Sequence, residues 1–172
     1  EGQRALANNS VAYTDKPDME TFMREWLSLV ESKSGERGIF SRIAADDHVK
    51  RNGRRETGKE WGTNPCSEII LRPYQFCNLT EVVVRPTDTE KTLANKVRLA
   101  SILGTVQSTF TDMPYLRPIW RKNTEEERLL GVSLTGIMDN EITSNPSKKL
   151  LNKLRDTAVQ TNRDYAEQFG IS

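Results

Sequence analysis

The run Glu81-Val82-Val83-Val84, which is followed by Arg85-Pro86 and then by a helical pattern, decides the fold class of this chain. Its consecutive β-branched residues favour a strand. Beyond it, apolar residues recur at helical spacing from Thr89 to about Phe110 and would share one face: Leu93, Val97, Ala100 and Leu103. A strand that leads into such a helix is the first indication of an α/β protein.

The elements on either side of this unit agree with it. Apolar spacing and capping residues predict four further helices. One covers Asp18–Lys33 with Asp18 as its N-cap, and a second covers Ser41–Arg51. A third opens at Thr124, in a capping box with Glu127, and the last covers Asn145–Gly170 with Asn145 as its N-cap. Further strands are predicted at Ser10–Tyr13 and Glu68–Leu71, and Gly131–Met138 is ambiguous between helix and strand. This order predicts an α/β fold with helices outside a mainly buried sheet.

Composition excludes several classes of protein. The chain has 172 residues, and 25 basic against 24 acidic side chains leave a net charge of +1, so no global field attracts nucleic acid or a membrane surface. No apolar run approaches the roughly 20 residues of a membrane-spanning helix. Two cysteines are too few for a disulfide scaffold and indicate a reducing compartment, the cytoplasm. The missing initiator Met and the abrupt end after Gly170 lead us to expect a portion of a larger chain.

Most of the chemically useful side chains lie in one segment, Thr63–Leu71, which is followed by a second cysteine, Cys77. Pro65 disfavours helix for the residue before it, so we expect this segment to be extended. Alternate side chains of an extended segment share a face, at steps of roughly 6.6 Å. Asn64, Cys66 and Glu68 would then present an amide, a thiol and a carboxylate to one sugar-sized ligand.

The same residues also allow plainer interpretations. A cysteine is more often a small buried apolar residue than a reagent. A zinc site is not expected, because the chain has no Cys-x-x-Cys pair and its one histidine, His48, is remote in sequence. A disulfide between Cys66 and Cys77 is sterically conceivable but would be unusual in a reducing compartment.

The run Asn64-Pro65-Cys66-Ser67-Glu68-Ile69-Ile70-Leu71, with Phe76-Cys77-Asn78-Leu79 after it, closely resembles the active-site segment of ribonucleotide reductases. It is most similar to that of the monomeric, adenosylcobalamin-dependent ribonucleoside-triphosphate reductases. The resemblance continues through Ala7–Val11, Ser34–Gly38 and Glu127–Ser133. It implies that residues 1–172 are part of a ten-stranded α/β barrel of the ribonucleotide reductase and glycyl-radical type. A finger loop at about residues 62–80 would lie inside this barrel, with no separate second domain.

The resemblance also implies a role for each residue of the site. Cys66 matches the cysteine that becomes a thiyl radical, after homolysis of the cobalt–carbon bond of adenosylcobalamin, and abstracts the 3′-hydrogen of the ribose. Glu68 matches the base that accepts the 3′-hydroxyl proton. Asn64 matches the amide that binds the ribose hydroxyls, with Pro65 beside it in the substrate site. Cys77 matches one of the two cysteines that reduce the 2′-carbon. The expected substrate is a ribonucleoside triphosphate, and no resident metal site is expected.

The chain departs from the family in three ways. It has no third cysteine to pair with Cys77, no Gly/Ser-rich phosphate-binding turn and no C-terminal cysteine pair. We therefore expect the segment alone to be inactive. Its implied partners are the remaining reductase polypeptide and thioredoxin or a similar dithiol donor.

Three alternatives remain open at this point. The first is an iron-dependent reductase of the same superfamily, and the second is a non-catalytic interaction module derived from a reductase. The third, nucleic-acid binding through the basic run Lys50–Arg55, has little support from a near-zero net charge. Such runs are usually exposed helix ends. We also expect His48 on the surface and Trp26 in the core, whereas Trp61 is left open between packing and surface.

Overall fold

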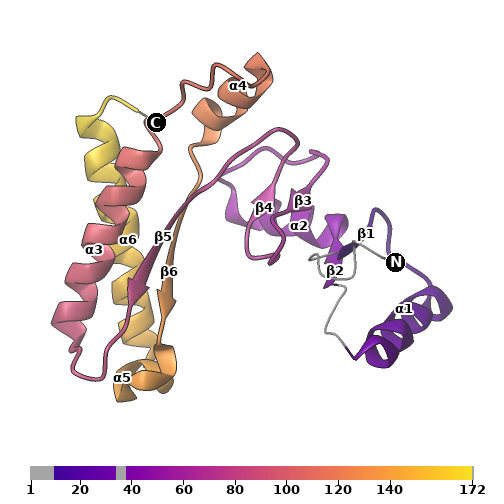
Figure 1. The fold of residues 1–172 in the computed structure, drawn as a ribbon, viewed down its shortest axis with the longest axis horizontal. Helices are drawn as coiled ribbons and strands as arrows, with labels where there is room; N and C mark the ends of the chain where they lie inside the picture. Colours follow the sequence, from indigo (N-terminus) through magenta and orange to yellow (C-terminus); the bar gives the residue numbers. More distant parts are fainter. Residues whose placement is uncertain (1–9, 34–37, 172) are drawn as a thin grey trace. The chain divides into compact units, whose positions relative to one another are not determined.

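The computed structural model describes residues 10–33 and 38–171, and the chain divides after Gln75 into two compact units (Figure 1). The similar stretches Ala7–Val11 and Ser34–Gly38 lie mostly outside the described residues. Within those residues, no helix has the length and apolar character needed to cross a membrane.

The first unit contains two short sheets and two helices. Its elements are β1 (Ser10–Tyr13), α1 (Met19–Ser32), β2 (Gly38–Ser41), α2 (Arg42–Asn52), β3 (Gly62–Thr63) and β4 (Ile70–Leu71). Strands β1 and β2 are parallel, with Ser10 opposite Gly38, and β3 and β4 are antiparallel, with Gly62 opposite Leu71. The predicted strand at Ser10–Tyr13 is confirmed, whereas β2 and β3 were not predicted.

Helix α1 begins as the sequence predicts. The Asp18 carboxylate accepts the Thr21 N–H at 2.8 Å, which also lowers the pKa of Asp18. The apolar face of this helix is exposed, however, and Trp26 is 51% exposed rather than in the core, so that prediction is wrong. Apolar spacing shows which face of a helix is hydrophobic, but it does not show whether another element covers that face.

The core of the first unit is built around Trp61, which is 1% exposed. Ala45 and Val49, both buried on α2, pack with it, and Phe40 and Ile70 pack against this cluster from β2 and β4. The helix predicted over Ser41–Arg51 is confirmed as α2, and it is capped by the Ser41 hydroxyl, which accepts the Ala44 N–H at 3.2 Å. The core thus ties α2 to the β3–β4 hairpin through Trp61.

The second unit consists of two parallel strands with helices packed beside them. Its elements are β5 (Asn78–Val83), α3 (Glu90–Gln107), α4 (Pro118–Glu127), β6 (Leu130–Thr135), η2 (Ile137–Asp139), α5 (Glu141–Ser144) and α6 (Lys148–Gln168). Helix α3 packs on both strands, and α6 lies along α3 (Figure 1). The core between them holds Val82, Val84, Leu93, Val97, Ala100, Leu150 and Leu154. This strand–helix arrangement confirms the expectation from the Glu81–Val84 run.

Two predicted helix starts in the second unit are wrong. Helix α4 begins at Pro118, whose fixed φ suits the first helical position, and Thr124 lies near the end of that helix as a buried residue. Helix α6 is capped by Ser147, whose hydroxyl accepts the Leu150 N–H at 3.1 Å, rather than by Asn145. In α4 the residue at the N-cap position, Arg117, makes no side-chain capping bond, and Pro118 marks the start instead. In α6 two capping residues, Asn145 and Ser147, lie two positions apart, and the sequence pattern did not distinguish them.

The ambiguous stretch Gly131–Met138 forms strand β6 followed by the short helix η2. Gly136 separates the two elements with φ +71°, and a Cβ there would lie 2.7 Å from the Val84 carbonyl oxygen. A glycine is needed at this point for both reasons.

The predicted α/β class agrees with this architecture. Among the described residues the strands form three two-stranded sheets, two of them parallel, and they do not form a barrel. The ten-stranded barrel, and the assignment of both units to one barrel domain, therefore stay predictions.

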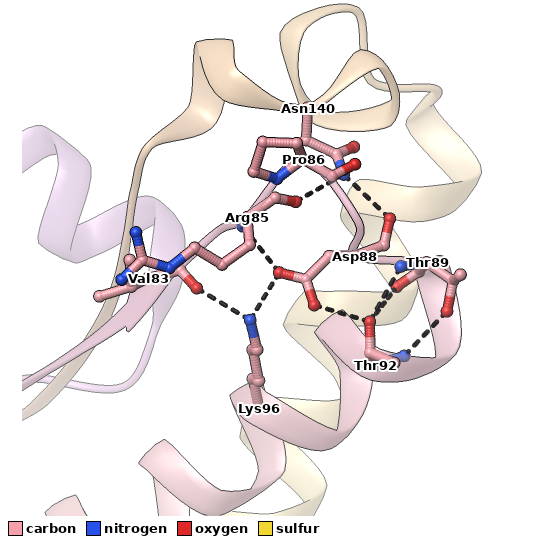
Figure 2. Close-up of polar contacts among 8 residues, drawn as sticks. All are labelled: Val83, Arg85, Pro86, Asp88, Thr89, Thr92, Lys96 and Asn140. Carbon is pink, nitrogen blue, oxygen red and sulfur yellow. Dashed lines mark hydrogen bonds and ion pairs between the residues drawn. The ribbon is translucent and has the colours of Figure 1, made fainter.

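Asn140 fastens the loop between β5 and α3 to the start of α5 (Figure 2). Its side-chain nitrogen donates to the carbonyl oxygens of Arg85 at 2.9 Å, Pro86 at 3.2 Å and Asp88 at 2.9 Å. Its side-chain oxygen accepts the Ile142 N–H at 2.9 Å. Because Asn140 is 5% exposed, these bonds satisfy a side-chain amide that water reaches poorly.

Asp88 organises the same loop through its carboxylate (Figure 2). The ammonium group of Lys96 lies 2.5 Å from Asp88 Oδ2, and it also donates to the Val83 carbonyl at 3.0 Å. The Arg85 N–H and the Thr92 hydroxyl each donate to the carboxylate at 2.8 Å. The bond from Lys96, with these others, lowers the pKa of Asp88 from its ordinary 3.8 to about 2.

This lowered pKa predicts a loss of stability in acid. The folded state favours the ionised carboxylate, so the contribution of Asp88 is fully present above about pH 4 and is lost as the pH falls toward 2. Thermal unfolding followed by circular dichroism from pH 5 to pH 2 should show a steeper fall for the wild type than for Asp88→Asn. Asp139→Asn, on an exposed residue, is the control. Parallel curves for Asp88→Asn and the wild type would contradict this assignment.

Candidate functional site

The segment singled out in the sequence forms a short hairpin in the first unit. Strands β3 and β4 pair through Gly62–Leu71 and Thr63–Ile70, and residues 64–69 form the connection between them. Asn64, Pro65, Cys66 and Glu68 all lie in this connection, which we call the cysteine loop (residues 64–69).

The cysteine loop is a turn, so the prediction of an extended segment is wrong. The Ser67 N–H donates to the Asn64 carbonyl at 3.0 Å, which closes a four-residue turn with Pro65 and Cys66 at its centre. Proline suits the second position of such a turn, because its fixed φ matches the turn geometry. Pro65 excluded helix for Asn64, as expected, but a turn satisfies that restriction as well as a strand does. Contrary to the sequence prediction, Asn64, Cys66 and Glu68 therefore do not lie on one face of a strand.

Asn64 holds the base of the loop. Its Oδ1 accepts the Ile69 N–H at 3.1 Å and the Thr63 hydroxyl at 3.3 Å, and its own N–H donates to the Ile69 carbonyl at 3.4 Å. The oxygen of the side-chain amide is thus occupied within the loop. The donors that a bound hydroxyl group could use belong to Nδ2 of Asn64.

Cys66 and Glu68 are both exposed, on either side of Ser67. Ser67 has φ +65°, a left-handed conformation that costs energy for a residue with a Cβ. Because Cys66 is exposed, the plainer interpretation of it as a buried apolar residue is wrong for this structure. The loop brings Asn64, Cys66 and Glu68 within five consecutive residues, in a turn held by hydrogen bonds.

Cys77 lies in the second unit, half-buried and directly before β5. Its neighbour Phe76 packs against Trp120, with ring centroids 4.7 Å apart. The placement of Cys77 relative to the cysteine loop stays a prediction from the sequence.

A polar cluster around Trp61 supports the hairpin. The Trp61 indole N–H donates to Asp46 Oδ1 at 2.8 Å, and the Gly58 N–H donates to the same oxygen at 2.7 Å. These two bonds, the first more strongly, lower the pKa of Asp46. The Arg42 Nε donates to the Trp61 carbonyl at 2.9 Å. Trp61, directly before β3, is thus held by hydrogen bonds at both its side chain and its backbone.

Arg55 is the residue that the sequence reasoning missed. It was placed in the exposed basic run Lys50–Arg55, but it is half-buried, and its guanidinium carbon lies 4.6 Å from the centre of the Trp61 ring. Its Nη1 donates to the Ile70 carbonyl at 2.8 Å and its Nη2 to Gln75 Oε1 at 3.1 Å. No local signal distinguishes Arg55 from Arg54 in the sequence, because these partners lie 15 and 20 residues away along the chain.

Trp61→Ala should lower the free energy of unfolding of the first unit by about 3–5 kcal/mol, because it leaves a cavity in the core and removes the partner of Asp46. Urea unfolding followed by far-ultraviolet circular dichroism measures this. Trp26→Ala, on a residue that is 51% exposed, is the matched control and should cost less than about 1 kcal/mol. Equal losses for the two variants would refute the placement of Trp61 in the core.

The other candidate features are His48, a possible metal site and an open cavity. His48 is exposed, as predicted. Among residues 10–33 and 38–171, no three His, Cys, Asp or Glu side chains gather closely enough to hold a metal ion. An open cavity of about 500 Å³ lies between α2 and the segment before β3, lined by charged and apolar side chains that include Arg42, Lys59 and Trp61. It is too small to enclose a corrin ring with its axial groups.

Comparison with known proteins gives one informative match. No family model matches the chain, and no solved structure matches it. Over 146 residues, 79% of this chain, it is 33% identical to an adenosylcobalamin-dependent ribonucleoside-triphosphate reductase of Lacticaseibacillus paracasei. The chain is similar to a segment of a ribonucleotide reductase. The match spans 18% of that reductase's length.

Proposed function

We propose that this chain is a catalytic segment of an adenosylcobalamin-dependent ribonucleoside-triphosphate reductase, with Cys66 as the carrier of the thiyl radical. The observation that carries the proposal is the 33% identity with a reductase of that name. The geometry of the cysteine loop supports it, because an exposed thiol stands at the centre of a hydrogen-bonded turn, between an amide and a carboxylate. A fixed and accessible thiol is what a hydrogen-atom transfer to sulfur needs.

In the proposed reaction, the Cys66 sulfur radical takes the hydrogen atom from C3′ of the ribose and becomes a thiol. The radical then resides on C3′, which makes the 3′-hydroxyl group more acidic. Glu68 accepts the 3′-hydroxyl proton, a step that suits an exposed carboxylate two residues from the sulfur. The Nδ2 group of Asn64 donates to the ribose hydroxyls while its Oδ1 keeps the loop closed.

Reduction of the 2′-carbon needs two electrons and two protons. The 2′-hydroxyl leaves as water, and two thiols are oxidised to a disulfide. The 3′-hydroxyl proton returns from Glu68, and the C3′ hydrogen finally returns from Cys66, which regenerates the radical on sulfur. We assign one of the two thiols to Cys77. The second has to come from another polypeptide segment, because Cys66 and Cys77 are the two cysteines in the sequence.

The cofactor is proposed from the relative's name, which states dependence on adenosylcobalamin. The open cavity between α2 and the segment before β3 is too small to enclose a corrin ring. The substrate class, the remaining reductase polypeptide and a dithiol donor such as thioredoxin are proposed on the same ground. The cytoplasmic location stays a prediction from the two cysteines.

Formation of deoxyribonucleotide tests the proposal. The chain, combined with polypeptide that supplies the other reductase segments, should convert a ribonucleoside triphosphate to its deoxy form when adenosylcobalamin and a dithiol are present. Omission of adenosylcobalamin should abolish the product. Product formation that needs an iron subunit instead would identify the iron-dependent class, and the absence of product under all these conditions would favour a non-catalytic module.

A further inference from the structure

We propose that Arg55 is a positioning residue that fixes the cysteine loop relative to the turn at residues 72–75. The inference rests on the proposed function, since it concerns the geometry of the same site. Arg55 contacts three points of the first unit: the Trp61 ring before β3, the Ile70 carbonyl in β4 and the Gln75 side chain. These points lie on either side of the cysteine loop and beyond it.

The three contacts use the shape of the guanidinium group. Its central carbon lies over the Trp61 ring while two of its nitrogens donate to two different acceptors, Ile70 and Gln75. An ammonium group has no plane and places its charge at one point, so lysine cannot reproduce the whole arrangement. Hydrogen bonds from a charged donor are also stronger than neutral ones. The position therefore requires arginine rather than a positive charge alone.

Gln75 extends the anchor beyond β4, to the last residue of the first unit. Gln75 is 5% exposed, and its Oε1 accepts both Arg55 Nη2 and the Arg72 N–H, each at 3.1 Å. This oxygen closes the turn from Arg72 to Gln75 directly after β4 ends at Leu71. Through one side-chain oxygen, Arg55 is thus joined to the hairpin that carries Cys66 and to the turn that precedes Cys77.

The Arg55 side chain is itself held in place. Trp61, on which it rests, is the largest fully buried side chain of the described residues, and its indole N–H is bonded to Asp46. Asp46 lies on α2, so the anchor extends from this helix to the hairpin. The pairing of β3 with β4 is short, so the loop would be free to shift if Arg55 were absent. A shift of about 1 Å in a reacting group is enough to slow a reaction about 100-fold.

Amide hydrogen exchange tests the anchor without any activity assay. Arg55→Lys and Gln75→Met should raise exchange in residues 62–71 roughly tenfold, while the amides of α2 keep their protection. Gln75→Glu keeps an acceptor oxygen and should restore wild-type exchange in the hairpin. Arg54→Lys, on the exposed neighbour, is the matched control and should change nothing. Unchanged exchange in the hairpin of Arg55→Lys, or an equal rise throughout the first unit, would overturn the inference.

Turnover in the reductase assay gives the second readout. Arg55→Lys should lower kcat about 10- to 100-fold and leave KM within about twofold, because substrate binding groups remain while the sulfur is misplaced. A raised KM with an unchanged kcat would overturn the positioning role. If Cys66→Ser keeps wild-type turnover, the proposed function fails, and the exchange experiment still decides whether Arg55 anchors the hairpin.

Discussion

Cys66→Ser should reduce deoxyribonucleotide formation to the background of an assay without enzyme. Serine fits the turn as well as cysteine does, because the Cys66 side chain is exposed. Its O–H bond is much stronger than an S–H bond, so an oxygen at this position cannot serve as a reversible hydrogen-atom carrier. The loss is therefore expected in kcat, with no change in folding, and it is measured by chromatographic separation of deoxyribonucleotide from substrate.

Ser67→Gly is the matched control for Cys66→Ser in the same turn. Glycine adopts the φ of +65° at this position more easily than serine, so the turn should be kept and the variant should stay active. If Cys66→Ser and Ser67→Gly retain the same turnover, the assignment of the radical to Cys66 is wrong.

Glu68→Gln should lower kcat by about 10²- to 10⁴-fold, the usual contribution of a general base. Glutamine keeps the size of the side chain and its ability to accept a hydrogen bond, but it does not take a proton from the 3′-hydroxyl group at neutral pH. Initial rates at saturating substrate measure the loss. Stability should hardly change, because Glu68 is exposed.

Glu81→Gln provides the comparison for that variant. Glu81 is an exposed carboxylate on β5 and has no role in the proposed reaction. The Glu81→Gln variant should have the kcat of the wild type. A Glu68→Gln variant that matches Glu81→Gln in kcat would remove Glu68 from the mechanism.

The sequence predicted the elements that depend on local pattern and capping. The apolar spacing that begins at Leu93 gave helix α3 close to its observed bounds, and Asp18 was identified as the cap of α1. Trp26 was misplaced, because burial depends on a second element that the helix pattern does not specify. Strand β3 was missed because two residues are too few to carry an alternating pattern.

The site was predictable in its residue types and less so in its geometry. Asn64, Cys66 and Glu68 were identified from their spacing and from a resemblance, but the segment is a turn and not a strand. Proline at position 65 is compatible with both, and the hydrogen bonds of Asn64 favour the turn. Arg55 could not have been found, because its partners become neighbours only when the hairpin packs on Trp61.

The central claim is hydrogen-atom transfer from the ribose to the sulfur of Cys66. The most direct measurement is the competitive isotope effect on turnover with a ribonucleoside triphosphate that carries deuterium at C3′. The wild type should discriminate against the deuterated substrate, and Cys66→Ser should convert neither substrate. Conversion of both substrates by Cys66→Ser at the wild-type rate, with no discrimination, would contradict this claim.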